Sequence, residues 1–83
     1  MAMNKKKHKV GVAVCVDNTA SEDLQLRKLY RILADPKATR LGCLRVVDDS
    51  GEDYLYPASR FVVLKLPQPV QKHLLAVINA DAA

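Results

Sequence analysis

The stretch from Leu41 to Leu66 constrains the fold most strongly, because it carries several strand patterns separated by short turns. "LGCLRVV", "EDYLYP" and "FVVLKL" are short runs rich in β-branched and aromatic residues. Between the first two, "DDSG" offers Asp and Ser side chains that bind nearby backbone amides, and Gly51 accepts a positive φ. Pro57 and "ASR" form the next break. The segment therefore predicts a compact antiparallel β-meander.

A further strand is expected at residues 10–16, where valines alternate with Gly11, Ala13 and Cys15 in a period of two. The intervening positions are also small and apolar, so the second face of this strand is expected to pack under another element. The polar residues 17–25 then predict a long loop.

The C-terminal part predicts a helix over residues 67–80. Pro67 and Pro69 end the sheet and suit a first helical turn, where a missing N–H costs nothing. An apolar stripe follows at helical spacing, and it consists of Val70, Leu74, Val77 and Ile78. A helix this short is not stable alone, so the stripe is expected to cover the β-structure or to meet a partner chain.

The segment Leu26 to Leu33 is ambiguous. Leu26, Leu29, Tyr30 and Leu33 fall at helical spacing, and Ser21 could cap a helix, so periodicity alone favours one. Pro36 ends the element, and residues 37–40 are expected to be a connection.

The stretch "RKLYRILADPKATRLGCLRVVDDSGEDYLYPASRFVVLKLP" resembles a family of short uncharacterised bacterial proteins, with "SGEDYLYP" as its most specific part. That family resembles small SH3-like barrels, and the resemblance implies that residues 26–33 form the second strand. The fold expected is mainly β: an SH3-like five-stranded barrel over residues 10–66, with a short C-terminal helix at 67–80. The resemblance implies no substrate or cofactor.

The net charge of +4 is concentrated at the N-terminus. Residues 1–9 contain basic residues and no acid, whereas basic and acidic residues balance over residues 10–83. Two interpretations stay open: a solvated flexible tail, or an arm that attracts phosphates or anionic lipid. The candidate anion contacts are Lys5, Lys6, Lys7 and Lys9.

No pattern indicates catalysis or a bound metal. Cys15 and Cys43 are far apart and lack the spacing of a zinc site, so we interpret them as buried thiols. The carboxylates of "DDSGED" lack the spacing of a calcium loop. Polyproline recognition is disfavoured because the chain has no Trp. We therefore predict no enzyme activity and no cofactor.

Two binding functions remain for a chain of 83 residues. The favoured one is a protein-interaction module that binds another protein or a second copy of itself. The alternative is a nucleic-acid-associated barrel that uses the lysine tail with arginines of the barrel, among them Arg27 and Arg60. The candidate partner-binding residues are Tyr30, Tyr54, Arg31 and Arg45.

The basic tail followed by apolar residues 10–16 superficially resembles a secretory signal. The apolar run is too short and has no cleavage site, and no stretch is as long as a membrane helix. The expectation is a cytoplasmic protein that does not bind membranes.

Overall fold

The computed structural model describes residues 10–82, with side chains described as far as residue 78. The predicted basic tail therefore lies outside the described residues. In chain order the elements are β1 (Val10–Cys15), β2 (Leu29–Leu33), α1 (Pro36–Arg40), β3 (Cys43–Val47), β4 (Asp53–Pro57), the 3₁₀ turn η2 (Ala58–Arg60), β5 (Phe61–Leu64) and α2 (Gln68–Ala82).

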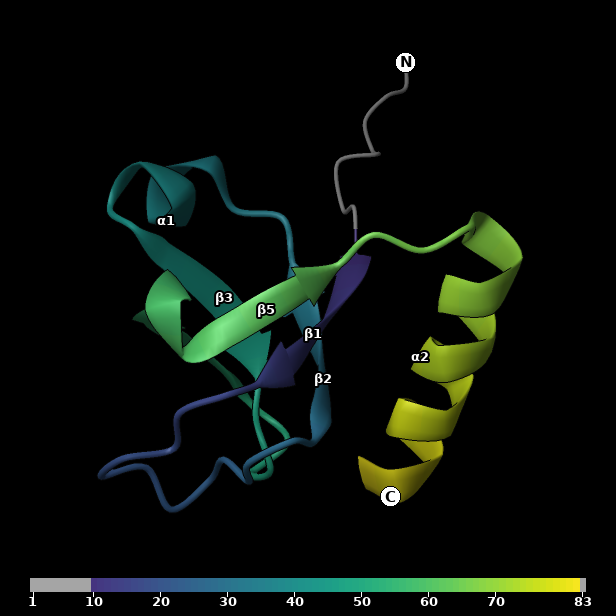
Figure 1. The fold of residues 1–83 in the computed structure, drawn as a ribbon, viewed down its shortest axis with the longest axis horizontal. Coiled ribbons are helices and arrows are strands. Elements are labelled where there is room, and N and C mark those ends of the chain that lie inside the picture. Colours follow the sequence, from purple (N-terminus) through teal and green to yellow (C-terminus); the bar gives the residue numbers. More distant parts are fainter. Residues whose placement is uncertain (1–9, 83) are drawn as a thin grey trace.

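The five strands form one antiparallel sheet in the order β4-β3-β2-β1-β5. The meander pairs consecutive strands, and β5 then returns to lie beside β1 (Figure 1). The prediction of a mainly β domain with five strands and a C-terminal helix is confirmed. Closure of the sheet into a barrel stays a prediction, since β4 and β5 are the two edges of the described sheet.

One face of the sheet carries the hydrophobic core. Ala13 lies opposite Tyr30 in the β1–β2 pair, and Ile32 lies opposite Val46 in the β2–β3 pair. Phe61 closes this face from β5, with its ring edge-on to the Tyr30 ring at 6.2 Å between centroids. The buried core residues are Ala13, Cys15, Leu24, Tyr30, Val46 and Phe61.

Helix α2 covers the other face of the sheet beside β1 and β2 (Figure 1). The side-chain amide of Gln71 donates a hydrogen bond to the Val10 carbonyl oxygen at 3.0 Å, which fixes the first turns of the helix to β1. Val12, on the covered face, is fully buried. The structure thus confirms that the second face of β1 packs under another element. The helix covers it incompletely, because Val70 and Val77 stay 46% and 48% exposed.

Residues 29–33 form strand β2, so the helix favoured by periodicity is wrong. The strand implied by the resemblance over residues 26–33 is confirmed for residues 29–33, whereas residues 26–28 belong to the preceding loop. The apolar spacing misleads because both faces of β2 are covered. Tyr30 and Ile32 point to the core, while Leu29 and Leu33 lie on the face shared with Val12. A strand covered on both sides loses the alternation by which strands are normally recognised.

Residues 37–40, expected to be a connection, belong to the short helix α1 instead. The Ala38 N–H donates to the Asp35 carboxylate at 3.1 Å, and Pro36 occupies the first helical turn. An aspartate cap followed by proline is a strong start signal for a helix. Gly42, at φ 76°, then ends the turn in a conformation that glycine adopts without strain.

The two cysteines are free thiols. Cys15 is buried, as predicted, whereas Cys43 is half-buried, so burial of both thiols was wrong in part. Their separate places explain this difference: Cys15 belongs to the core and Cys43 begins β3 on the opposite face from Leu44 and Val46.

Candidate functional site

The outer edge of β5 is one of the two edges of the described sheet and pairs with no other strand of it. The Val16 N–H donates to the Arg60 carbonyl at 2.8 Å. Along two antiparallel strands, pairs of residues that exchange hydrogen bonds alternate with pairs that do not. Because Arg60 is bonded to Val16, the next residues of β5 that bond to β1 are Val62 and Leu64. The N–H and C=O groups of Val63 and the C=O of Phe61 therefore point to the free edge, whereas the Phe61 N–H donates to the Ala58 carbonyl of the preceding turn.

The side chains of β5 leave this edge unprotected. Val62 and Val63 are 51% and 44% exposed, although successive residues point to opposite faces of a sheet. No charge or proline interrupts Phe61–Leu64, and the nearest charged residues are Arg60 and Lys65 at its two ends. Such an edge is a template for pairing with another chain.

The opposite edge, β4, carries the features by which proteins block strand addition. The Asp48 N–H donates to the Glu52 carbonyl at 3.1 Å, and the same alternation turns the backbone of Asp53, Leu55 and Pro57 outward. Pro57 has no N–H to offer, and Asp53 places a carboxylate at the start of the strand. The two edges therefore differ in their capacity to bind an extended segment.

Tyr30, a predicted partner contact, lies in the core with only 2% of its surface exposed. Its hydroxyl accepts a hydrogen bond from the Gln25 N–H at 2.8 Å and donates one to Asp49 Oδ2 at 3.0 Å. Burial, together with the neighbouring Asp49 carboxylate, raises the pKa of Tyr30 above its usual range. The ring thus joins the long loop to the β3–β4 hairpin and offers almost no surface to a partner.

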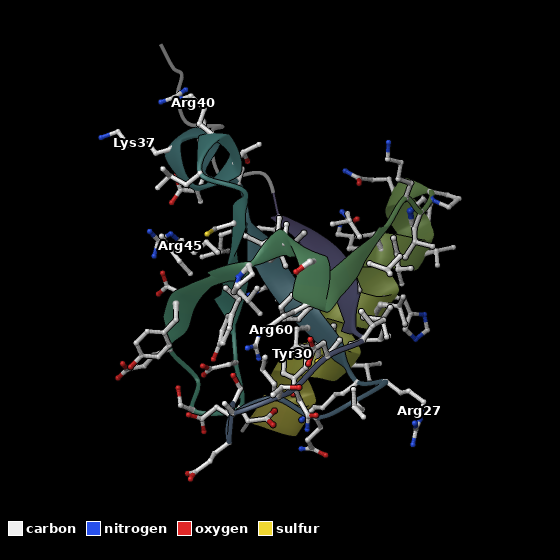
Figure 2. All side chains as sticks on the ribbon, turned by 60° about the vertical axis from the view of Figure 1, so that its left-hand side comes forward. Arg27, Tyr30, Lys37, Arg40, Arg45 and Arg60 are labelled. Carbon is white, nitrogen blue, oxygen red and sulfur yellow. The ribbon has the colours of Figure 1, made fainter. Side chains whose placement is uncertain are left out.

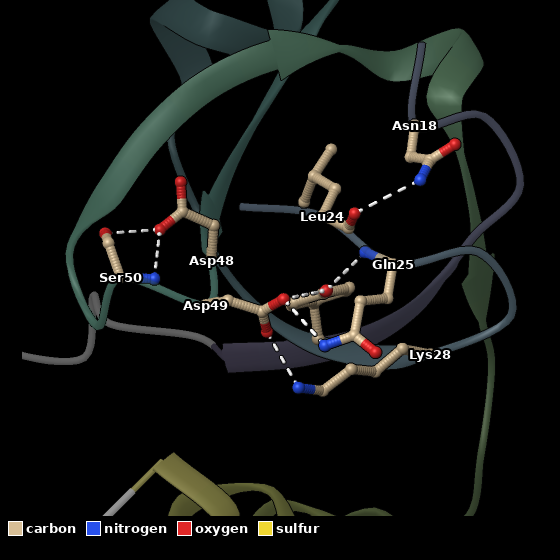
Figure 3. A network of polar contacts seen from close by, with 8 residues as sticks. Asn18, Leu24, Gln25, Lys28, Asp48, Asp49 and Ser50 are labelled. Atoms are coloured by element: carbon tan, nitrogen blue, oxygen red, sulfur yellow. Dashed lines mark hydrogen bonds and ion pairs between the residues drawn. The ribbon is translucent and has the colours of Figure 1, made fainter. Parts of the chain in front are cut away.

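Asp49 is the centre of this network (Figure 3). Lys28 Nζ lies 2.7 Å from Asp49 Oδ1, and the Gln25 side-chain amide donates to Oδ2 at 3.0 Å. Partial burial raises the pKa of Asp49, but hydrogen bonds from Lys28, Gln25 and Tyr30 outweigh it and hold the pKa below its usual range. The carboxylate is therefore fully engaged within the protein.

Asp48 is buried beside this network but has its own donors. Its Oδ1 accepts hydrogen bonds from the N–H and hydroxyl of Ser50, and its Oδ2 accepts one from the Tyr56 hydroxyl at 2.6 Å. Burial and the hydrogen bond to Asp48 raise the pKa of Tyr56. The turn chemistry predicted for "DDSG" is thus present, and Asp48 fixes the hairpin to the core face.

Tyr54, the second predicted contact, is 50% exposed on β4. Its hydroxyl donates to Glu52 at 3.1 Å, and this hydrogen bond raises the pKa of Tyr54. Tyr54 therefore remains an accessible aromatic side chain, in contrast to Tyr30.

The predicted arginines do not converge on one surface. Arg45 Nε lies 2.8 Å from Asp35 and its Nη1 lies 3.0 Å from Asp53, so this guanidinium is already paired. Arg60 donates to the Thr19 carbonyl and to Ser21. Figure 2 shows Arg27 at the opposite end of the molecule from Lys37 and Arg40 on α1. These basic residues therefore do not form one face, and nucleic-acid binding stays a prediction.

Sequence reasoning missed the free edge of β5, which is the feature that distinguishes the surface most clearly. The run Phe61–Leu64 was recognised as a strand, but a strand pattern does not show whether both of its edges are paired. The sequence held no local signal of the free edge, because edge strands usually carry charged residues and this uncharged run is typical of an interior strand.

Among the side chains that the structure describes, those of residues 10–78, no group of three or more His, Cys, Asp or Glu lies together in a way that could hold a metal ion. Within the described residues 10–82, no helix has both the length and the apolar character needed to cross a membrane. No protein-family model, curated protein or solved structure matches the chain.

Proposed function

We propose that this chain is a non-catalytic protein-interaction module that takes up an extended segment of a partner protein as a sixth strand beside β5. The observation that carries the proposal is the unpaired, uncharged edge of β5, where the N–H and C=O of Val63 and the C=O of Phe61 point outward. Strand addition to an exposed sheet edge is a recurring mode of peptide recognition.

The neighbouring side chains support an apolar partner segment. Val62 and Val63 expose apolar surface on both sides of the strand, so alternate side chains of an added strand would each meet a valine. Lys65, which is exposed just after β5, favours a segment that carries an acidic residue near its end. Backbone hydrogen bonds would supply affinity, and these contacts would supply selectivity.

The proposal is tested with a synthetic peptide of alternating valine and threonine residues that has a glutamate at each end. Hydrogen exchange of the backbone amides, followed by NMR, reports the edge residue by residue. We expect the peptide to protect the amide of Val63, because within Phe61–Leu64 this N–H points to the free edge and the Phe61 N–H already donates to the Ala58 carbonyl. Val62 and Leu64, already bonded to β1, should change little.

Two proline variants form a matched pair for this measurement. Val63→Pro removes an outward N–H without removing a bond to β1, and proline is tolerated on an edge strand in that position. It should abolish protection by the peptide while the fold is retained. Leu55→Pro makes the same change on the β4 edge and should leave peptide binding intact.

Sedimentation velocity of the free protein separates a partner segment from a second copy. A dimer that disappears in Val63→Pro would show that the edge is used by the chain itself. Peptide binding that is equal in Val63→Pro and in the unmodified chain would reject the β5 edge as the docking site.

A further inference from the structure

A cleft lies between α2 and the sheet, on the side away from the core. It has a volume of about 510 Å³, within the range of about 300–1,000 Å³ typical of small-molecule sites. Its apolar walls come from α2 and from the covered face of β2 and β3. These wall residues are Leu29, Val47, Leu74, Val77 and Ile78.

Arg31 enters this cleft from β2, where it lies opposite Val12 and Val47 in the two adjoining strand pairs. Its Nε is buried and has no hydrogen-bond partner, and no described residue forms an ion pair with its guanidinium. A buried donor without an acceptor is unfavourable and rare in folded proteins. An acceptor supplied from outside the described residues would remove that cost.

The other charged groups that line the cleft already have partners within the protein. Lys28 and Asp49 pair with each other at 2.7 Å, and Figure 3 shows them together on the side of the loop network that faces α2. Asp48 receives its hydrogen bonds from Ser50 and Tyr56. Arg31 is therefore the one charged group in the described lining without a described partner.

We propose that this cleft binds a small amphipathic monocarboxylate, with the carboxylate on Arg31 and an aliphatic tail against α2. The planar guanidinium matches a carboxylate through two parallel hydrogen bonds. A single unpaired positive charge balances one negative charge, and the nearby Asp48 and Asp49 disfavour a dianion such as a phosphate ester. This site is separate from the β5 edge and does not depend on the function proposed for it.

Octanoate is the probe, used below the concentration at which it forms micelles, with 1-octanol as the neutral analogue of equal chain length. NMR follows the Arg31 Nε–Hε resonance and the methyl groups of Leu74, Val77 and Ile78. We expect octanoate to shift both sets of signals. It should bind about 10- to 100-fold more tightly than 1-octanol, as a hydrogen bond to a charged group implies.

Variants of the cleft residues test separately where the carboxylate and the aliphatic tail of the ligand bind. Arg31→Met keeps an apolar stem and should lower octanoate affinity at least about tenfold while leaving 1-octanol binding unchanged. Val77→Asp should abolish binding of both probes. Val70→Asp is its control, because Val70 is as exposed as Val77 on the same helix but does not line the cleft.

Three results would overturn the proposal. One is the absence of shifts at the cleft with octanoate. Another is equal binding of octanoate and 1-octanol with no effect of Arg31→Met, which would make the cleft merely apolar. The third is a shift of the Arg31 Nε–Hε signal in ligand-free Asp81→Asn, which would identify the chain's own Asp81 as the partner of the arginine.

Discussion

The Tyr30 hydroxyl donates a hydrogen bond to Asp49 Oδ2 over 3.0 Å and thereby joins strand β2 to the β3–β4 hairpin. The Tyr30 hydroxyl oxygen also accepts a hydrogen bond from the Gln25 N–H, so this one side chain binds both the long loop after β1 and the hairpin turn. Tyr30 itself is buried, so its hydroxyl depends on these two groups for its hydrogen bonds. These contacts therefore hold the loop after β1 and the turn of the β3–β4 hairpin against the sheet.

Tyr30→Phe is expected to destabilise the fold by about 1–3 kcal/mol, the usual cost of leaving a buried polar group without its partner. The variant keeps the ring against Phe61 and removes only the oxygen shared by Gln25 and Asp49. Urea unfolding followed by circular dichroism measures the change. Tyr54→Phe is the control, since its exposed hydroxyl contacts only Glu52, and it should unfold at the same urea concentration as the unmodified chain. Equal stability of all three proteins would contradict the role given to the Tyr30 hydroxyl.

Substitutions of Asp35 can distinguish the contribution of a helix cap to stability from that of an ion pair. Its Oδ1 accepts the Ala38 N–H at the start of α1, while its Oδ2 lies 2.8 Å from Arg45 Nε. Asp35→Asn keeps a capping oxygen and loses the charge, whereas Asp35→Ala loses both contacts. We expect a small drop in melting temperature for Asp35→Asn and a clearly larger one for Asp35→Ala. Equal drops in the two variants would mean that the cap contributes nothing.

Much of the fold could be predicted from local chemistry. The turn residues of "DDSG", the break at Pro57 and the prolines at the start of α2 each leave few conformations to the chain, and the elements between them are where the patterns place them. Residues 29–33 were harder, because α2 covers the side of β2 that would otherwise be polar. Strand β2 therefore carries Leu29 and Leu33 on that face, on either side of Arg31, and its apolar spacing matches that of a helix.

The candidate site depends on long-range pairing, which local patterns do not contain. A shift of one residue in the β1–β2 register would turn Tyr30 from the core to the face under α2 and would bring Arg31 into the core. The exposure of the β5 edge likewise follows from β5 pairing with β1, its distant neighbour in sequence. Residue type alone therefore suggested Tyr30 as a contact, although the register buries it.

Acid is expected to weaken the fold through Asp49 and Asp35. Burial opposes the charge of Asp49, but hydrogen bonds from Lys28, Gln25 and Tyr30 lower its pKa, and the Arg45 hydrogen bond lowers the pKa of Asp35. A folded-state pKa below the unfolded value gives stability that is complete above about pH 4 and is lost as the pH falls through the folded pKa. Urea unfolding over a series of acidic pH values measures this loss.

Asp49→Asn isolates the contribution of one carboxylate to that acid response. The asparagine has no charge to lose, so the difference in unfolding free energy between the variant and the unmodified chain should shrink as the pH falls. A difference that stays constant down to the lowest pH would show that the pKa of Asp49 is the same in the folded and unfolded chains.

Alkali is expected to divide the three tyrosines of the chain into two classes. The pKa of Tyr30 is raised mainly by burial, and so is that of Tyr56, which also donates to Asp48. A raised folded-state pKa gives stability that is complete below about pH 10 and is lost as the pH rises toward the folded pKa. Tyr30 and Tyr56 should therefore ionise only as the protein unfolds, whereas exposed Tyr54 titrates in the folded state. Tyrosinate absorbance recorded together with circular dichroism tests this, and Tyr54→Phe should remove the phase that precedes unfolding. Ionisation of all the tyrosines before any loss of structure would contradict the buried network around Asp48 and Asp49.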